Sequence, residues 1–145
     1  SKGLGCPVGA VLSGSRDFIH EAWRWKHRIG GAMRQAGVVA AAGSWALKHH
    51  VDRLAEDHEN AQLLAKRISA LDGVTLVNEK IETNMVFFDV SQTPLSAAEI
   101  SARLRGKGIW IGAFGEQRMR AVTHVDVRRE DIIETSDALA DILVH

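Results

Sequence analysis

Lys2 stands in a setting that could support covalent chemistry. Gly3 and Gly5 follow it, and the apolar run Val8–Leu12 just downstream predicts a short buried strand. A lysine held by glycine-rich backbone beside a buried strand can lose the hydration of its ammonium group. The neutral amine is then a nucleophile that forms Schiff bases with carbonyl compounds. Spacing alone favours the other interpretation, an exposed lysine in a terminal loop, because lysine side chains are usually solvated.

The segment around Lys2 must position it, and this segment is rich in glycine. Seven of the thirteen glycines fall in the first 37 residues, where the backbone is expected to turn tightly or approach another group closely. Apolar residues at spacings of three and four predict a helix that begins after Ser15 and reaches Ile29. The apolar segment Val38–Leu47 predicts a second helix, packed closely on several sides.

A long amphipathic helix is expected next. Apolar residues keep helical spacing from Leu47 to Leu71, Asp72-Gly73 ends the helix, and its charged residues, Asp57 among them, are expected on the solvent side. His58 lies on the apolar stripe, where a packed, hydrogen-bonded histidine is favoured over a ligand or a catalytic base. We therefore leave His58 out of the predicted site.

Beyond Gly73 the pattern changes to short elements. Residues with high β-propensity predict strands over Val74–Val77, Met85–Val90, Ile109–Ala113 and Met119–Val125.

Two helices accompany these strands. Ser96-Ala-Ala-Glu99 is a capping box that opens a helix ending at Gly106, and a last helix is expected over Asp131–Val144. In the last strand the period of two places Arg120 and His124 on one face.

The order of these elements predicts an α/β protein in three parts. We expect residues 1–46 to be the C-terminal end of a larger domain, residues 47–73 to be the connecting long helix, and residues 74–145 to be a small α+β domain.

The composition excludes several classes of partner. Eighteen Lys and Arg balance eighteen Asp and Glu, so the formal net charge is zero and favours neither nucleic acid nor an anionic membrane. No stretch reaches the roughly 18 apolar residues of a membrane helix, and the one cysteine, Cys6, forms no internal disulfide. We expect a cytoplasmic protein without a metal site. The chain opens without Met, so we expect it to begin inside a longer protein.

Three motifs in matching order and spacing resemble one enzyme family. They are Ser1-Lys2-Gly3-Leu4-Gly5-Cys6-Pro7-Val8-Gly9, Gly30-Gly31-Ala32-Met33-Arg34-Gln35-Ala36-Gly37 and Arg120-Ala121-Val122-Thr123-His124-Val125-Asp126. Together with Asp57-His58 and Thr83-Asn84-Met85-Val86-Phe87-Phe88, they look like the low-specificity L-threonine aldolases, which belong with the aromatic amino acid β-eliminating lyases. The resemblance covers essentially the whole chain. It implies the C-terminal portion of a pyridoxal 5'-phosphate enzyme of the aspartate aminotransferase fold (fold type I).

The resemblance assigns the cofactor-binding residues. Lys2 matches the lysine that binds pyridoxal phosphate as a Schiff base, and Ser1 beside it either hydrogen-bonds near the phosphate or shapes the turn. Arg34 matches an arginine that approaches the cofactor phosphate from the neighbouring subunit, and a planar guanidinium on a glycine-rich loop suits a phosphate. The alternative for Arg34 is helix capping or pairing with an acidic neighbour. His27 stands where some relatives have a lysine facing the phosphate, with Lys26 and Arg28 as substitutes.

The resemblance also assigns the substrate-binding residues. Arg120 matches the arginine that forks onto the α-carboxylate of the substrate, which orients the bond to be broken. Its alternative is a surface arginine, and Arg118 is the second choice for the same role. His124 is included in the site, although a structural histidine that orients Arg120 is the favoured interpretation.

The implied reaction is a retro-aldol cleavage. L-threonine, L-allo-threonine and related β-hydroxy-α-amino acids would give glycine and an aldehyde. Several groups of the family's site lie upstream of its lysine, so we expect the N-terminal half of the same enzyme to complete the site, in a homodimer or homotetramer. Candidate contact residues are Trp23, Trp25 and Val38–Leu47. Two alternatives stay open: a catalytically inert fragment that acts only in folding or oligomerisation, and a β-eliminating lyase of the same fold.

Overall fold

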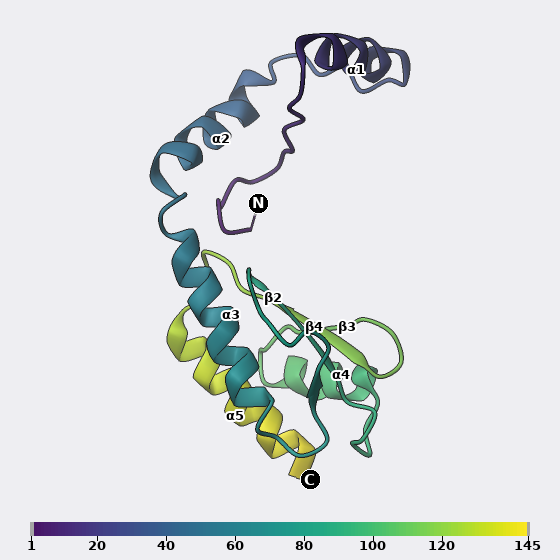
Figure 1. Ribbon diagram of the computed structural model, residues 1–145, viewed down its shortest axis with the longest axis vertical. Helices are drawn as coiled ribbons and strands as arrows, with labels where there is room; N and C mark the ends of the chain where they lie inside the picture. Colours follow the sequence, from purple (N-terminus) through teal and green to yellow (C-terminus); the bar gives the residue numbers. More distant parts are fainter. Residues whose placement is uncertain (1, 145) are drawn as a thin grey trace.

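The second half of the chain folds around one antiparallel sheet. A computed structural model describes residues 2–144 (Figure 1). The strands β1 (Thr75–Leu76), β2 (Met85–Asp89), β3 (Gly112–Ala113) and β4 (Arg118–Val122) pair in the order β1-β2-β4-β3. The central pair is β2 and β4, in which Phe87 lies opposite Arg120. All four strands lie within the ranges that the sequence predicts, or within one residue of them.

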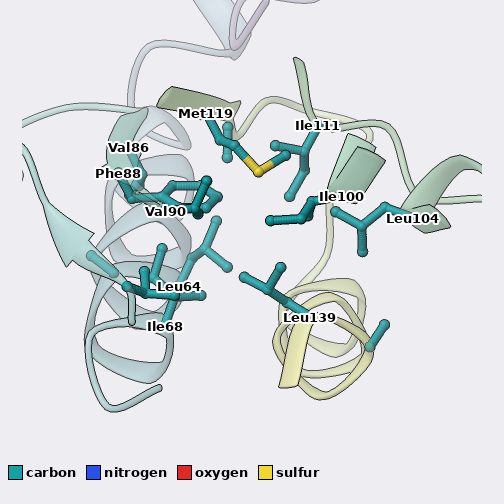
Figure 2. Close-up of a cluster of buried hydrophobic side chains, with 14 of the residues drawn as sticks. Leu64, Ile68, Val86, Phe88, Val90, Ile100, Leu104, Ile111, Met119 and Leu139 are labelled. Atoms are coloured by element: carbon teal, nitrogen blue, oxygen red, sulfur yellow. The ribbon is translucent and has the colours of Figure 1, made fainter. Parts of the chain in front are cut away.

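Three helices cover one face of this sheet. They are α3 (Leu54–Ile68), α4 (Ala97–Gly106) and α5 (Arg129–Val144), and their apolar sides meet alternate residues of the central strands (Figure 2). The fully buried side chains of this core include Ile68, Val86, Phe88, Ile100, Leu104, Met119 and Leu139. Because side chains alternate along a strand, Arg118 and Arg120 lie on the opposite, exposed face of β4.

The predicted capping box at the start of α4 is confirmed. The backbone N–H of Glu99 donates to Ser96 Oγ at 3.3 Å, and the Ser96 backbone N–H donates to the Glu99 carboxylate at 2.8 Å. The hydrogen bonds from Ser96 hold the pKa of Glu99 below its ordinary value. Local sequence thus fixes where α4 begins.

The first part of the chain holds two helices, α1 (Arg16–Arg28) and α2 (Gly37–His49), as the sequence predicts. The strand predicted over Val8–Leu12 is wrong: this run is irregular, and Val11 is 92% exposed. A strand needs a partner for its backbone groups, and the four strands of the sheet pair only with one another.

Both helices of this part form an arm that extends away from the sheet (Figure 1). No residue of α1 is buried, and in α2 only Ala46 is. The close packing expected on several sides of Val38–Leu47 is therefore absent between residues 2 and 144, where Val38 is 80% exposed.

The long helix expected from Leu47 to Leu71 is divided in two. Helix α2 ends at His49 and α3 begins at Leu54, with a turn between them, where the N-terminal residues dock. The prediction for Asp57 was also wrong. Asp57 is buried, because a position three residues after Leu54 and four before Ala61 faces the apolar side of α3. The division into parts at residues 46 and 73 stays a prediction.

None of the helices between residues 2 and 144 is both long and apolar enough to span a membrane.

Candidate active site

Lys2 begins a tight turn. The backbone N–H of Gly5 donates to the Lys2 carbonyl oxygen at 3.0 Å, which closes the turn over Gly3 and Leu4. Gly5 has a φ of +67°, a left-handed conformation that a side chain would strain. The glycine that the sequence places here is therefore required by the backbone, and the Lys2 side chain is left exposed.

Two side chains from the junction of α2 and α3 fasten this turn. Arg53 Nη1 donates to the Gly3 carbonyl oxygen at 3.0 Å, and His50 Nδ1 donates to the Leu4 carbonyl oxygen at 2.7 Å. Gly3 is buried, and a Cβ atom at its position would overlap Leu54 and Asp57. The backbone of the turn therefore packs directly against side chains at the start of α3.

Arg53 is itself held by Asp57, one helical turn further along α3. Arg53 Nη2 donates to Asp57 Oδ1 at 2.8 Å, and Nη1 donates to Oδ2 at 3.3 Å. The Asp57 side chain is 1% exposed and that of Arg53 18%. The hydrogen bond to Asp57 is the main cause that raises the pKa of Arg53 above its ordinary value, and burial opposes it. The sequence analysis missed both residues; their (i, i+4) spacing, with Asp57 on the apolar side, was the signal for them.

An open hollow of about 420 Å³ adjoins Lys2. Its lining comes from the turn, from α3 and from the residues before β2: Lys2, Gly3, Leu4, Leu54, Asp57, His58, Thr83 and Asn84. His58, which the sequence analysis left out, is half-buried in this lining. An exposed amine beside an open hollow can react with a carbonyl compound that enters it.

Arg120 and Arg118 differ in their partners on the exposed face of β4. Arg118 Nε lies 3.8 Å from Asp89 Oδ2, and hydrogen bonds from Ser91, with a smaller contribution from Arg118, hold the pKa of Asp89 below its ordinary value. The guanidinium of Arg120 lies over the ring of Phe114, 5.6 Å from its centroid, and forms no ion pair with any residue from 2 to 144. Arg120 is therefore the arginine with donors to offer to an anion.

His124 follows β4 and lies half-buried beside Asp126, with 3.4 Å between its Nδ1 and Asp126 Oδ2. It lines a different hollow from that of Lys2, together with Trp110 and Val127. The structure therefore does not bring His124 into the lining of the hollow beside Lys2.

The two predicted phosphate ligands lie on the arm, and the structure does not bring them to Lys2. His27 Nδ1 donates to the Trp23 carbonyl oxygen at 2.8 Å at the end of α1, and Arg34 lies exposed in the loop before α2. The Lys2 turn docks at the junction of α2 and α3, whereas α1 lies at the far end of the arm (Figure 1). Ser1 lies outside the described residues.

Solved structures share this fold. A putative L-allo-threonine aldolase from Listeria monocytogenes matches 97% of the chain with a TM-score of 0.69 and 22% identity, over 42% of that chain. The 8-amino-7-oxononanoate synthase of Francisella tularensis matches 94% with a TM-score of 0.73 and 16% identity, also over 42% of that chain. The chain thus has the mixed α/β fold of a portion of the fold type I enzymes, and the predicted fold class is confirmed.

The sequence defines the family within this fold. The profile of the beta-eliminating lyase family matches residues 1–91, and the chain belongs to this family. It is 42% identical over 136 residues to the low specificity L-threonine aldolase of Escherichia coli strain K12. The aligned residues make up 94% of this chain and 39% of that protein. It is 37% identical over 133 residues to the low-specificity L-threonine aldolase 1 of Arabidopsis thaliana, covering 91% and 37%. The predicted resemblance is confirmed, and the chain spans about two fifths of the length of these relatives.

Proposed function

We propose that this chain is the lysine-bearing portion of a pyridoxal phosphate-dependent lyase that cleaves L-threonine and related β-hydroxy-α-amino acids to glycine and an aldehyde. The similarity to L-threonine aldolases over nine tenths of the chain carries the proposal, and the family match over residues 1–91 includes Lys2. The single cysteine and the neutral charge agree with a cytoplasmic enzyme.

The residues present fit pyridoxal phosphate. The cofactor needs an amine for its aldehyde and cations for its phosphate. The exposed amine of Lys2 adjoins a hollow, and Arg34 is an exposed guanidinium without an acidic partner between residues 2 and 144. When bound, the cofactor supplies an electron sink for the bond that breaks in the substrate.

Lys2 would hold the cofactor covalently, and Arg34, with His27 and Ser1, would hold its phosphate. His27 lies in α1 and Arg34 in the loop before α2, whereas the Lys2 turn docks at the junction of α2 and α3, at the other end of the arm from α1 (Figure 1). A second copy of the chain that places its arm beside this hollow would bring the groups together, which supports a homodimer or a homotetramer as the working assembly.

Arg120 would bind the α-carboxylate of the amino acid. A guanidinium matches a carboxylate with two parallel hydrogen bonds, which fixes the orientation of the substrate as well as its position. The Phe114 ring beneath Arg120 restricts where the guanidinium can lie. His124 is proposed as a supporting residue beyond the end of the same strand.

The remaining groups of the site would come from residues outside this chain. In this proposal residues 1–46 end a larger cofactor domain, residues 47–73 connect, and residues 74–145 form the small domain. The relatives are more than twice as long as the chain, which supports this division.

β-Elimination is the second candidate. The description of the matching family favours it, since that family is named for beta-eliminating lyases. Elimination would release pyruvate and ammonia from an amino acid with a leaving group at the β-carbon, whereas aldol cleavage releases glycine and an aldehyde.

The test uses the natural-length protein with pyridoxal phosphate. We expect an absorption band near about 420 nm and glycine with acetaldehyde from threonine, with Lys2→Ala abolishing the band and lowering activity about 1000-fold or more. Lys80→Ala is the control, because Lys80 is an exposed lysine paired with Glu82 away from the hollow. 2-Oxobutanoate and ammonia in place of glycine and acetaldehyde would select β-elimination of threonine. A Lys2→Ala protein that keeps the band would exclude Lys2, and a wild-type protein without the band would overturn the proposed function.

A further inference from the structure

One of the residues that seat the Lys2 turn, Asp57, also contacts the residue that follows the strand of Arg120. The Thr123 hydroxyl donates to the Asp57 backbone carbonyl oxygen at 2.6 Å, three residues beyond Arg120. Arg53 bridges the Asp57 carboxylate and the Gly3 carbonyl oxygen, next to Lys2. One helical turn of α3 therefore contacts both the turn of Lys2 and the end of β4.

The end of β4 is fixed from its other side as well. Thr123 N–H donates to the Asn84 carbonyl oxygen at 2.9 Å, and Asn84 Nδ2 donates to the Thr123 carbonyl oxygen at 2.8 Å. Asn84 also lines the hollow beside Lys2. These bonds leave the backbone after Arg120 little freedom to move relative to α3.

The pair joins a half-buried arginine to a buried aspartate, and stability alone is a weak reason for such a pair. Removing charges from water is costly, and apolar residues of similar size often stabilise a fold as well or better. A planar guanidinium, however, can bind a carboxylate through two N–H donors and still donate a hydrogen bond to a third acceptor. A lysine ammonium fixes the directions of its hydrogen bonds less precisely. The third acceptor here is the Gly3 carbonyl oxygen.

We propose that Arg53 and Asp57 are positioning residues that hold the Lys2 turn in a fixed relation to the strand of Arg120. Arg53 orients the turn, and Asp57 orients Arg53 through its carboxylate and β4 through its carbonyl oxygen. The inference rests on the proposed function for the roles of Lys2 and Arg120. Neither positioning residue touches the substrate in this mechanism.

The test compares three variants of the natural-length protein. Arg53→Lys keeps the charge and loses the planar fork, and Asp57→Asn keeps the shape and loses the charge. Arg67→Lys is the matched control, because Arg67 lies on the same helix and forms a similar pair of bonds to Ser136 and Asp137 of α5, away from Lys2. Each protein is measured for hydrogen exchange of the Gly3–Gly5 amides without cofactor, and for its dissociation constant for pyridoxal phosphate.

Arg53→Lys is expected to speed exchange of the Gly3–Gly5 amides about tenfold and to raise the dissociation constant about tenfold. Asp57→Asn should change both in the same direction, and Arg67→Lys should lower the unfolding midpoint without changing either. Wild-type exchange in both Arg53→Lys and Asp57→Asn would overturn the inference, as would equal changes in Arg67→Lys. If the wild-type protein binds no pyridoxal phosphate, the proposed function fails, and the exchange data alone decide whether Arg53 holds the turn.

Discussion

Gly3 shows how one missing side chain can seat the turn of Lys2. Its carbonyl oxygen accepts from Arg53, and an added Cβ would overlap Leu54 and Asp57. Gly3→Ala is therefore expected to lower the free energy of unfolding by about 1–3 kcal/mol, because the turn must move off α3. Denaturant unfolding of this chain measures the change.

Gly43→Ala is the matched control for that experiment. Gly43 lies within α2, and an added Cβ there meets no atom within 4 Å. Alanine at this helical position should raise the free energy of unfolding, by at most about 1 kcal/mol. A Gly3→Ala protein as stable as the wild type would contradict the docking of the turn.

Arg120 and Arg118 offer a paired test of carboxylate binding. Arg118 already lies near Asp89, whereas Arg120 lies over the Phe114 ring and has no acidic partner between residues 2 and 144. In the natural-length enzyme, Arg120→Lys should raise the KM for threonine about 10- to 100-fold, since one ammonium cannot reproduce a bidentate fork. Arg118→Lys should change it less than about threefold. Steady-state kinetics decide, and the reverse ranking would make Arg118 the ligand.

Sequence points to a residue of the candidate site where that residue belongs to a motif, and not where its role depends on tertiary contact. Lys2 and Arg120 stand in motifs of recognisable order, and their roles stay proposals. In the sequence Arg53 and Asp57 are ordinary charged residues of an amphipathic helix, whereas in the structure Arg53 contacts the Gly3 carbonyl oxygen from more than 40 residues away along the chain. That long-range contact has no signature in local spacing.

The start of helix α4 gives a pH-dependent prediction. Hydrogen bonds from Ser96 lower the pKa of Glu99, so the unfolded chain binds a proton more readily than the folded chain. The stabilisation is fully present above the ordinary pKa of Glu99 and is lost as the pH falls through the lowered one. Glu99→Gln keeps the hydrogen-bonding shape without titration. The wild type should have a higher midpoint of thermal unfolding than Glu99→Gln at about pH 6, and this difference should disappear at about pH 3.

The contact between α3 and β4 gives a second prediction. Thr123 is 2% exposed, and its hydroxyl donates to the Asp57 carbonyl oxygen. Thr123→Val keeps the shape, removes the donor and leaves the Asp57 oxygen without this partner, which should cost about 1–3 kcal/mol of unfolding free energy. Thr93→Val serves as the comparison, because the Thr93 hydroxyl also donates to a backbone carbonyl oxygen but Thr93 is less buried. Equal losses of unfolding free energy in the two variants would show that the buried hydrogen bond of Thr123 stabilises the fold no more than that of Thr93.

Elements were predictable where their signals are local. The Ser96 capping box fixed the start of α4, and period-two alternation placed Met119 inside and Arg120 outside. The strand predicted over Val8–Leu12 was wrong because an apolar run forms a strand only if another strand pairs with it. The break between His49 and Leu54 was not predicted for a related reason, since the helical spacing of apolar residues continues across a turn that tertiary contacts stabilise.

The chain as a whole is uneven in how much apolar surface it buries. Nearly all buried apolar residues belong to α3, α4, α5 and the sheet, whereas Ile29 and Trp25 of the arm are 78% and 57% exposed. Exposed apolar area on this scale marks a surface that another chain or domain covers. The proposed assembly provides such a cover, since the arm would carry Arg34 to a neighbouring site.

This unevenness leads to a prediction that separates folding from assembly. In the chain of 145 residues, Leu139→Ala should lower the free energy of unfolding by about 2–5 kcal/mol, because Leu139 is fully buried between α5 and the sheet. Trp25→Ala should change it by less than about 0.5 kcal/mol, because Trp25 lies exposed on α1, beside Arg28 of the same helix. In the natural-length protein Trp25→Ala should instead weaken the oligomer, which sedimentation velocity at decreasing concentration would detect. A large loss of stability from Trp25→Ala in the shorter chain would show that the arm folds against the sheet unit on its own, and the arm would then not need a second copy to cover it.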